Sequence, residues 1–302
     1  MKINKNKKEL FIFLIILLSL ITIVYFINKY ISGIYLTQLC NNTPSQMMGY
    51  LIKTKNSKTI AIDGGYFGDT DNFIKVLNEK YGGKVDYWFI THPHQDHASV
   101  FIDIVQNHPE IEIGNVYYTI NGLDWYKKYG SGRDEEAVRF FEALSNERIK
   151  NNLHEVSINE KIKIDNIKCE ILGIKNPEIT ENAINNSSMV IKMKVNNKSV
   201  LFLGDTGKES GEKLLKNQKD KLKSDVVQMA HHGQSGADKD LYEVIRPKIC
   251  LWPTPDWLWN NDSGGGFNTG NWKTLETREW MNSLNVKINY IEKDGNISIK
   301  IW

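Results

Sequence analysis

The sequence predicts a layered α/β protein in which two β-sheets pack face to face, with helices on their outer surfaces. Short β-type runs alternate with amphipathic helical patterns from residue 48 onward, and the β-type runs gather in two groups along the chain. No repeat and no interdomain linker interrupts residues 45–302, so this stretch is expected to form one domain.

The first group of β-type runs comprises "GYLIKT", "TIAID" and "VDYWFIT". Helices are expected at three places: "TDNFIKVLNEKYGG", which ends in a glycine stop, "ASVFIDIVQNHPE", which ends at Pro109, and "DEEAVRFFEALSNERIK". A polar loop with Gly130, Ser131 and Gly132 precedes the last of these helices. The strands of this group are therefore expected to form one sheet with helices on one face.

The second group begins with the runs "KIKID", "IKCEIL", "SMVIKMKV" and "SVLFLG". A helix at "GKESGEKLLKNQ" and a strand at "DVVQMA" follow, and then a strand at "KICLW". The chain closes with a helix at "WKTLETREWMN" and the strands "VKINYIE" and "NISIKIW". These runs predict the second sheet and its covering helices.

An apolar run, Leu10 to Ile27, precedes the domain and is broken only by Ser19 and Thr22. Eighteen residues at the helical rise nearly span a bilayer core, which predicts a transmembrane anchor over residues 10–30, a basic N-terminus at 1–9 and a linker at 31–44. The lysines before the run predict a cytoplasmic N-terminus and an extracytoplasmic body on the cell membrane. A secretory signal peptide is the alternative, although no small-x-small cleavage site follows.

Charge and cysteine content argue against two kinds of binding: nonspecific binding of nucleic acid through a general basic surface, and binding of metal by thiolates. The chain has a net charge of +2, but residues 1–32 hold five lysines and one acid, so the rest carries −2 and provides no general basic field for nucleic acid. The three cysteines are far apart and form no CxxC pair, which argues against a thiolate metal site. In an extracellular protein two of these cysteines could form one disulfide, but the apolar surroundings of Cys169 and Cys250 favour buried free thiols.

The stretch "HPHQDH", residues 92–97, carries the strongest signal for chemistry. It starts where a strand is expected to end, which is a common place for ligand sites in α/β proteins. His92 and His94 alternate in an extended segment, so both rings can point the same way, and Asp96 and His97 enter the next helix. Nitrogen and oxygen ligands at this spacing predict a site for two adjacent divalent cations.

These residues resemble the HxHxDH signature of the metallo-β-lactamase superfamily, a four-layer αββα sandwich of metal-dependent hydrolases. "TIAIDGG" is similar to its first motif, which implies that Asp63 supports the histidine loop. "VLFLGD" is similar to the motif whose aspartate bridges both metals, here Asp205, and "VVQMAHHG" is similar to its strand-end histidine motif. We expect His231 of that pair to be a ligand and His232 to donate hydrogen bonds.

One departure from the superfamily pattern, a missing histidine, indicates which branch of the superfamily the chain resembles. The superfamily has another histidine some twenty residues before the bridging aspartate, where this chain reads "ENAINNSSMVIKMKV" and offers Asn185 or Asn186 instead. An amide oxygen is a weaker zinc ligand than imidazole. Asn followed by Ser, with "HHG", resembles the hydrolase domains related to competence-type DNA-uptake channels, which implies phosphodiester chemistry and leaves both zinc and manganese open.

The resulting prediction is a hydrolase that uses hydroxide made by two cations, zinc first and manganese second. Its substrate is expected to be a phosphodiester, either nucleic acid or a phosphorylated cell-envelope component. The membrane is expected to be a partner through the N-terminal helix, and protein partners are left open. The alternatives are hydrolysis of a lactam, lactone or thioester, and a catalytically degenerate metal-binding module. The predicted metal ligands are His92, His94, Asp96, His97, Asp205 and His231, and the predicted catalytic residues are Asp96, His232 and Asn186.

An aromatic loop follows the histidine motif. Residues 250–272 hold Trp252, Trp257, Trp259 and Trp272 around three consecutive glycines. This loop is expected either to form a wall over the metals, where the rings stack on bases or enclose a quaternary ammonium group, or simply to pack onto the body.

Overall fold

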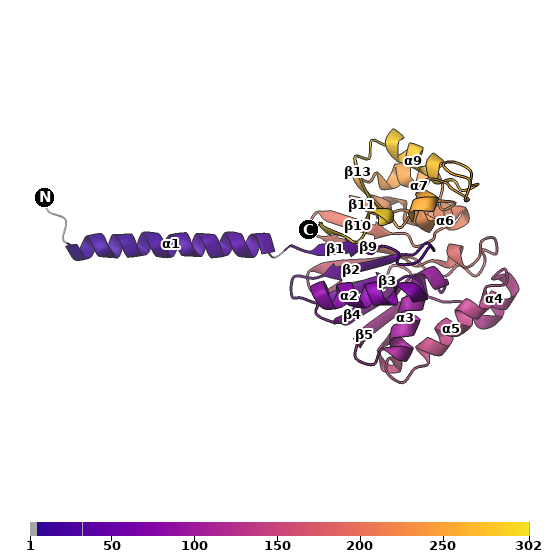
Figure 1. Ribbon diagram of the computed structural model, residues 1–302, viewed down its shortest axis with the longest axis horizontal. Helices are drawn as coiled ribbons and strands as arrows, with labels where there is room; N and C mark the ends of the chain where they lie inside the picture. Colours follow the sequence, from indigo (N-terminus) through magenta and orange to yellow (C-terminus); the bar gives the residue numbers. More distant parts are fainter. Residues whose placement is uncertain (1–4, 32, 302) are drawn as a thin grey trace.

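The computed structural model describes residues 5–31 and 33–301, and within them two seven-stranded sheets lie between outer helices (Figure 1). This is the predicted αββα sandwich. In sheet order, the first sheet contains β14 (Ile297–Lys300), β1 (Tyr35–Gln38), β2 (Gly49–Lys53), β3 (Thr59–Asp63), β4 (Lys84–Ile90), β5 (Glu112–Tyr118) and β6 (Leu153–Glu155). The second contains β13 (Ile288–Ile291), β12 (Ile249–Trp252), β11 (Val226–Gln228), β10 (Lys198–Phe202), β9 (Val190–Val195), β8 (Ile167–Gly173) and β7 (Lys161–Ile164).

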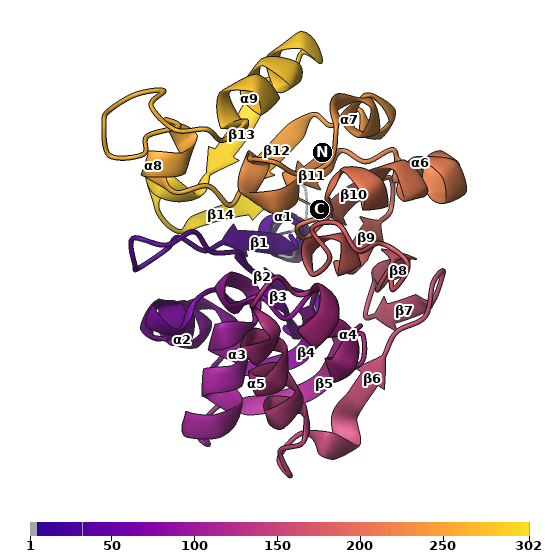
Figure 2. The same ribbon diagram turned by 90° about the vertical axis from the view of Figure 1, so that its right-hand side faces the viewer.

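Helices cover the outer face of each sheet (Figure 2). The first sheet is covered by α2 (Thr70–Tyr81), α3 (Gln95–Asn107), α4 (Leu123–Tyr129) and α5 (Asp134–Leu144). The second is covered by α6 (Lys208–Leu222), α7 (Lys239–Ile245) and α9 (Thr274–Ser283), and the short α8 (Asp256–Trp259) lies in the aromatic loop.

Alternation of side chains along the strands builds three apolar layers. Phe89, Ile191 and Phe202 belong to the layer between the two sheets, which is fully buried. Trp88 faces the other way and stacks on Phe73 of α2, with ring centroids 5.1 Å apart. Because one face of the central strands meets the partner sheet and the other meets helices, strands such as β3 are buried throughout, whereas β7, β8 and β9 keep exposed residues on their outer face.

The N-terminal predictions need two corrections. In the part of the chain that the structure describes, no helix is long and apolar enough to cross a membrane, so the anchor predicted over residues 10–30 is not supported. The apolar run lies in α1 (Lys5–Ile31), which extends away from the body (Figure 1), and residues 1–4 of the predicted basic N-terminus lie outside the described residues. Residues 31–44 are not only a linker, because they contain β1, which pairs with both β2 and β14.

The parallel strands bring their carboxyl ends to one end of the sandwich. β3, β4 and β5 are parallel to one another, and so are β10 to β13. β2 is antiparallel to both of its neighbours: its first residue, Gly49, pairs with Asp63 at the end of β3, and its last, Lys53, pairs with Tyr35 at the start of β1. The end of the sandwich that holds Asp63 is therefore opposite the end at which β1 follows α1. The segments with candidate ligands follow β4, β10 and β11, and they therefore converge here.

Candidate metal centre

Two groups of buried side chains converge at this end of the sandwich, and Asp205 belongs to both. The first group consists of His92, His94 and Asp205. The extended segment after β4 places His92 Nε2 3.0 Å from His94 Nδ1 and 3.9 Å from Asp205 Oδ2. Both histidines are buried, at 1% and 7% exposure.

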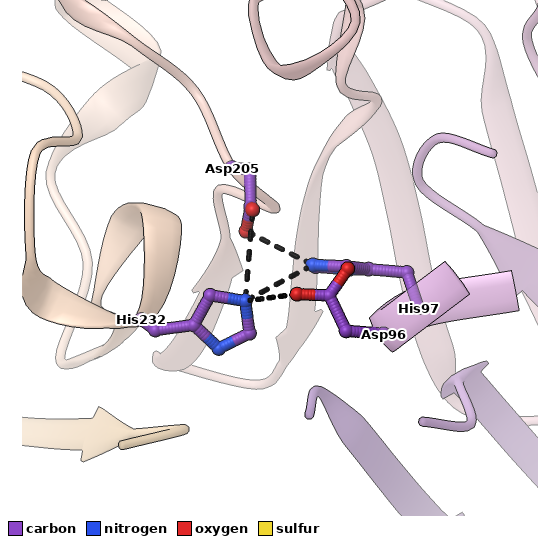
Figure 3. A group of neighbouring side chains, drawn as sticks. All are labelled: Asp96, His97, Asp205 and His232. Carbon is purple, nitrogen blue, oxygen red and sulfur yellow. Dashed lines mark hydrogen bonds and ion pairs between the residues drawn. The ribbon is translucent and has the colours of Figure 1, made fainter. Parts of the chain in front are cut away.

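The second group consists of Asp96, His97, Asp205 and His232 (Figure 3). His232 Nε2 lies 3.3 Å from Asp96 Oδ2, 3.6 Å from Asp205 Oδ2 and 3.3 Å from His97 Nε2. His97 Nε2 lies 3.1 Å from Asp205 Oδ1. Within each group the potential ligand atoms lie within 4.8 Å of one another, a separation that one cation could bridge.

The chain around Asp205 is shaped to deliver its carboxylate between the groups. Gly204 adopts φ +56°, and a Cβ there would lie 2.9 Å from the Ser188 side chain and 3.1 Å from that of Thr91. Glycine therefore allows the close approach. The Ser188 hydroxyl accepts a hydrogen bond from the Asp205 amide and lies 3.3 Å from His92 Nδ1, so one side chain fixes a residue from each half of the site.

Unpartnered oxygens show that the donor set fits cations. Asp96 Oδ1 is buried and makes no hydrogen bond, and Asp205 Oδ1 is buried with no hydrogen bond beyond its ion-pair contact of 3.1 Å with His97 Nε2. A buried oxygen without a partner is costly, about 1–3 kcal/mol or more when charged. Divalent cations held by these carboxylates and the neighbouring imidazoles would remove that cost.

The pKa shifts of the histidines differ between the two groups. Burial lowers the pKa of His92, and that of His94 to about 4, so these two rings are neutral and available to a cation. Burial opposes protonation of His232 too, but Asp205 and Asp96 outweigh it and raise the pKa of His232 to about 10. A cation in the second group would displace the proton of His232, because histidine ligands must be neutral to bind metal.

The left-handed turn after β11 decides which histidine joins the second group. His231 and His232 have φ values of +49° and +56°. His232 is fully buried, and its Nδ1 lies 2.7 Å from the Pro253 carbonyl oxygen, which leaves Nε2 free to act as a ligand. His231 Nε2 lies 3.8 Å from Asp205 Oδ2 and 3.3 Å from Asn185 Nδ2. The structure thus brings His232 into the group where the sequence analysis placed His231.

Asn185 and Asn186 also differ in their position relative to the cleft. Asn186 was predicted to be catalytic, but its Oδ1 accepts hydrogen bonds from the Ser210 amide and hydroxyl, and its Nδ2 donates to the Glu181 carbonyl and to Glu209. These contacts tie Asn186 to the start of α6, away from the ligand groups. Asn185 instead lines the open cleft, and its Oδ1 is buried without a hydrogen-bond partner.

A cleft of about 510 Å³ opens over the two groups. His94, Asp96, Asp205 and His231 contribute to its lining, together with Asn185, Tyr129, Arg133, Trp257 and Trp272. The tryptophans of the aromatic loop therefore fall into two pairs with different positions. Trp257 and Trp272 form a wall in edge contact, with centroids 4.9 Å apart, whereas Trp252 and Trp259 pack together on the body.

A family model for the metallo-β-lactamase superfamily matches residues 43–289. The chain belongs to this superfamily. The shared Asp205 and the "HPHQDH" loop both lie within the matched residues, and each follows the end of a strand. The three cysteines are free thiols, and neither of the two ligand groups contains one, so both groups have only nitrogen and oxygen donors.

A curated relative is similar to this chain in sequence, and two solved structures are similar to it in fold. ComE operon protein 3 of Bacillus subtilis (strain 168) is 26% identical over 179 residues, which is 59% of this chain and 21% of that protein. This chain therefore spans about a fifth of the length of that relative. The metallo-β-lactamase fold protein YhfI from Bacillus subtilis has a TM-score of 0.53 and 11% identity, covering 88% of this chain and 99% of its own. CmlA, a diiron β-hydroxylase from Streptomyces venezuelae, has a TM-score of 0.53 and 12% identity, covering 89% and 54%. These two likenesses concern the fold.

Two glutamines contribute to the superfamily site without any signal in the local sequence. Gln46 Nε2 donates to Asp96 Oδ2 at 2.8 Å, and Gln234 Nε2 donates to Gln46 Oε1 at 3.0 Å. Gln46 lies just after the predicted linker, and Gln234 follows the histidine pair. Their contact joins the two halves of the sandwich across the cleft, which only the tertiary structure reveals. The position of Gln234 beside "HHG" was the one available hint.

Asp63 supports the histidine loop, as the resemblance implied. Its Oδ2 lies 2.7 Å from His97 Nδ1 and accepts the Thr91 hydroxyl, while Oδ1 accepts the Thr91 amide. This carboxylate fixes the ring so that His97 Nε2 faces Asp205.

We expect Asp63→Asn to weaken metal binding by about 10- to 100-fold, because the oriented carboxylate partner of His97 is lost. Competition with a coloured chelator would measure this. Asp86→Asn is the matched control, since Asp86 is also a strand carboxylate of the first sheet but binds Lys58 and Lys84. Equal metal affinities in the two variants would contradict the assigned role.

Proposed function

We propose that this protein is a metal-dependent hydrolase that cleaves phosphodiesters. The observation that carries the proposal is the sharing of Asp205 by two buried ligand groups under an open cleft. Paired cations with one bridging carboxylate suit displacement at phosphorus, where attacking and leaving oxygens both need stabilisation.

The donor set assigns residues to each cation. His92, His94 and Asp205 would hold the first, and Asp96, His97, Asp205 and His232 would hold the second. When bound, such cations supply a hydroxide nucleophile near neutral pH and neutralise charge on the attacked group. Imidazole and carboxylate donors without thiolate suit zinc and also permit manganese, so we propose zinc first and manganese second.

The remaining side chains at the cleft act on protons and on the substrate. Asp96 has one oxygen fixed by Gln46, while its Oδ1 has no hydrogen-bond partner and can hold the proton of the hydroxide by accepting a hydrogen bond from it. His231 lines the cleft beside Asp205, close enough to contact the attacked group. It takes the role of hydrogen-bond donor that the sequence analysis gave to His232 and Asn186.

Arg133 supports an anionic substrate over a neutral lactam or lactone. Arg133 lines the cleft. Burial is the main cause of the lowered pKa of His94; Asp96 and Asp205 oppose that shift, and the positive charge of Arg133 adds to it. Its nearest carboxylate, Glu136, is 3.9 Å away, which is a loose ion pair. A guanidinium with free donors beside a cation site is well suited to phosphate oxygens.

Assays in parallel test the proposal. The full-length protein, loaded with zinc or manganese, is expected to hydrolyse a chromogenic phosphodiester and to lose this activity after chelation. The same protein is expected to leave a chromogenic lactam intact. Turnover of the lactam alone would overturn the phosphodiester assignment, and bound metal without any turnover would instead indicate a binding module.

The cellular location stays a prediction from sequence. The lysines at positions 2, 5, 7 and 8 are its only support, and they favour a body outside the cytoplasm.

A further inference from the structure

A row of lysines crosses three neighbouring strands on one face of the second sheet. Lys163 of β7 lies directly opposite Lys168 of β8, and Lys168 lies directly opposite Lys194 of β9. Directly paired residues share a face, and neighbouring strands are about 4.8 Å apart. Like charges placed opposite one another destabilise a sheet, so an anionic partner bound here would stabilise this arrangement.

The protein itself does not supply that partner. Within residues 33–301, the structure shows no ion pair or hydrogen bond for the side chains of Lys163, Lys168 and Lys194, which are all exposed. The adjacent row contains Glu170, but its carboxylate already binds Lys221 at 2.8 Å. These three ammonium groups therefore form an uncompensated positive surface, which we call the lysine row.

The lysine row lies beside a hollow. A depression of about 530 Å³ is lined by all three of its residues, together with Lys161, Lys192 and Lys221. Figure 2 shows β7 at the margin of the second sheet. Lysines on an edge strand commonly prevent edge-to-edge aggregation, which accounts for Lys163. It does not account for Lys168 and Lys194, because β8 and β9 are interior strands.

The same two strands connect this surface to the candidate metal centre. β8 ends at Gly173, and β9 begins at Val190 just after Ser188, which contacts His92. Lys168 lies five residues before Gly173, so the row is about 17 Å from the site end of the sheet, measured along β8. A polymer of several units could reach both places, whereas a small diester could not.

We propose that the lysine row binds the phosphate backbone of single-stranded nucleic acid while another part of the same strand occupies the cleft. The proposal rests on the proposed function for the cleft, and it adds a second contact surface. Charge complementarity supports a polyanion, and the exposed parts of Trp257 and Trp272 can stack on unpaired bases, which a wall polymer without aromatic groups lacks. The depression favours a chain that lies within it over a flat lipid surface.

The test is binding of a fluorescent oligothymidylate to the full-length, metal-free protein across a range of salt concentrations. The triple variant Lys163→Gln, Lys168→Gln, Lys194→Gln is expected to lower the slope of log affinity against log salt by about 2, since each phosphate contact contributes about 0.7. The affinity at low salt is expected to fall at least about tenfold. The control Lys55→Gln, Lys75→Gln, Lys287→Gln removes the same charge elsewhere and should leave the slope nearly unchanged.

Equal slopes for the two triple variants would overturn the proposal, as would row-dependent binding of phosphatidylglycerol vesicles without binding of the oligonucleotide. Turnover of a small chromogenic diester should be the same in the lysine-row variant and the wild type, because that substrate stays in the cleft. If neither the wild type nor the lysine-row variant turned over any substrate, the proposed function would be wrong. Binding of the oligonucleotide by the metal-free protein through the lysine row would be a separate result and would still support the proposal made here.

Discussion

Asp205→Asn is expected to abolish binding of both cations together and to lower kcat at least about 10³-fold, or about 4 kcal/mol. The reason is that Asp205 belongs to both ligand groups: Oδ1 lies 3.1 Å from His97 Nε2, and Oδ2 lies 3.9 Å from His92 Nε2. An amide of the same shape keeps the packing but removes the charge that two cations would share. The loss should therefore concern metal and turnover far more than folding.

Metal content per chain and turnover of a phosphodiester, measured on the same samples, check this expectation. Asp225→Asn is the matched control, because Asp225 is also an aspartate of the second sheet but pairs with Lys248 at 2.8 Å. Circular dichroism and thermal unfolding would confirm that both variants are folded. A folded Asp205→Asn protein that still binds two cations would remove the bridging role.

The two adjacent histidines are expected to respond differently. His232→Ala removes a ligand and leaves the carboxylates of Asp96 and Asp205 facing each other without a cation, so it should lose the second metal and at least about 10²-fold in kcat. His231→Ala should keep both metals, because His231 lies outside both groups, and its kcat should fall through the loss of a substrate contact. Metal content separates the two cases even where both variants are slow.

The opposite pattern, with metal lost in His231→Ala and retained in His232→Ala, would restore the assignment made from sequence. Conservative replacement of each histidine by Gln provides the matched pair, because the volume of the side chain is largely kept. Both Gln variants should show the same ranking as the Ala variants.

Local patterns in the sequence predicted the fold and most of the ligand groups. Apolar runs that end in Asp63, His92 and Asp205 mark strand ends, and strand ends of parallel sheets meet at one edge. The residue types and spacing of "HPHQDH" then leave little chemistry other than metal binding. For this part, the information is contained within a few neighbouring residues.

The parts that sequence could not supply depend on contacts between distant segments. The ring direction of His232 is fixed by the carbonyl of Pro253, twenty-one residues later, and nothing in "HHG" reveals that contact. Asn186 accepts a hydrogen bond from Ser210 of α6 and does not line the cleft. A contact with a helix that follows β10 therefore determines which of the two adjacent asparagines faces the cleft. The net charge of the body likewise gives no sign of the lysine row, because that charge is a sum over all residues. The row is recognised only when the strand register shows that the three lysines lie opposite one another.

Residues 31–44 show the same limit in the fold. β1 pairs with β14, where Tyr35 lies opposite Lys300, so a segment that looks like a linker completes a sheet with the far end of the chain. Gln46 lies two residues after this segment and donates to Asp96, so the chain enters the site directly after β1 and the loop that follows it.

The central claim is that two cations share Asp205, and anomalous diffraction from crystals of the protein grown with zinc or manganese tests it most directly. We expect two anomalous peaks about 3.5–4 Å apart, with an Asp205 oxygen about 2.0–2.2 Å from each. A single peak held by residues other than Asp205, or crystals soaked in metal that show no peak at this end of the sandwich, would contradict the account.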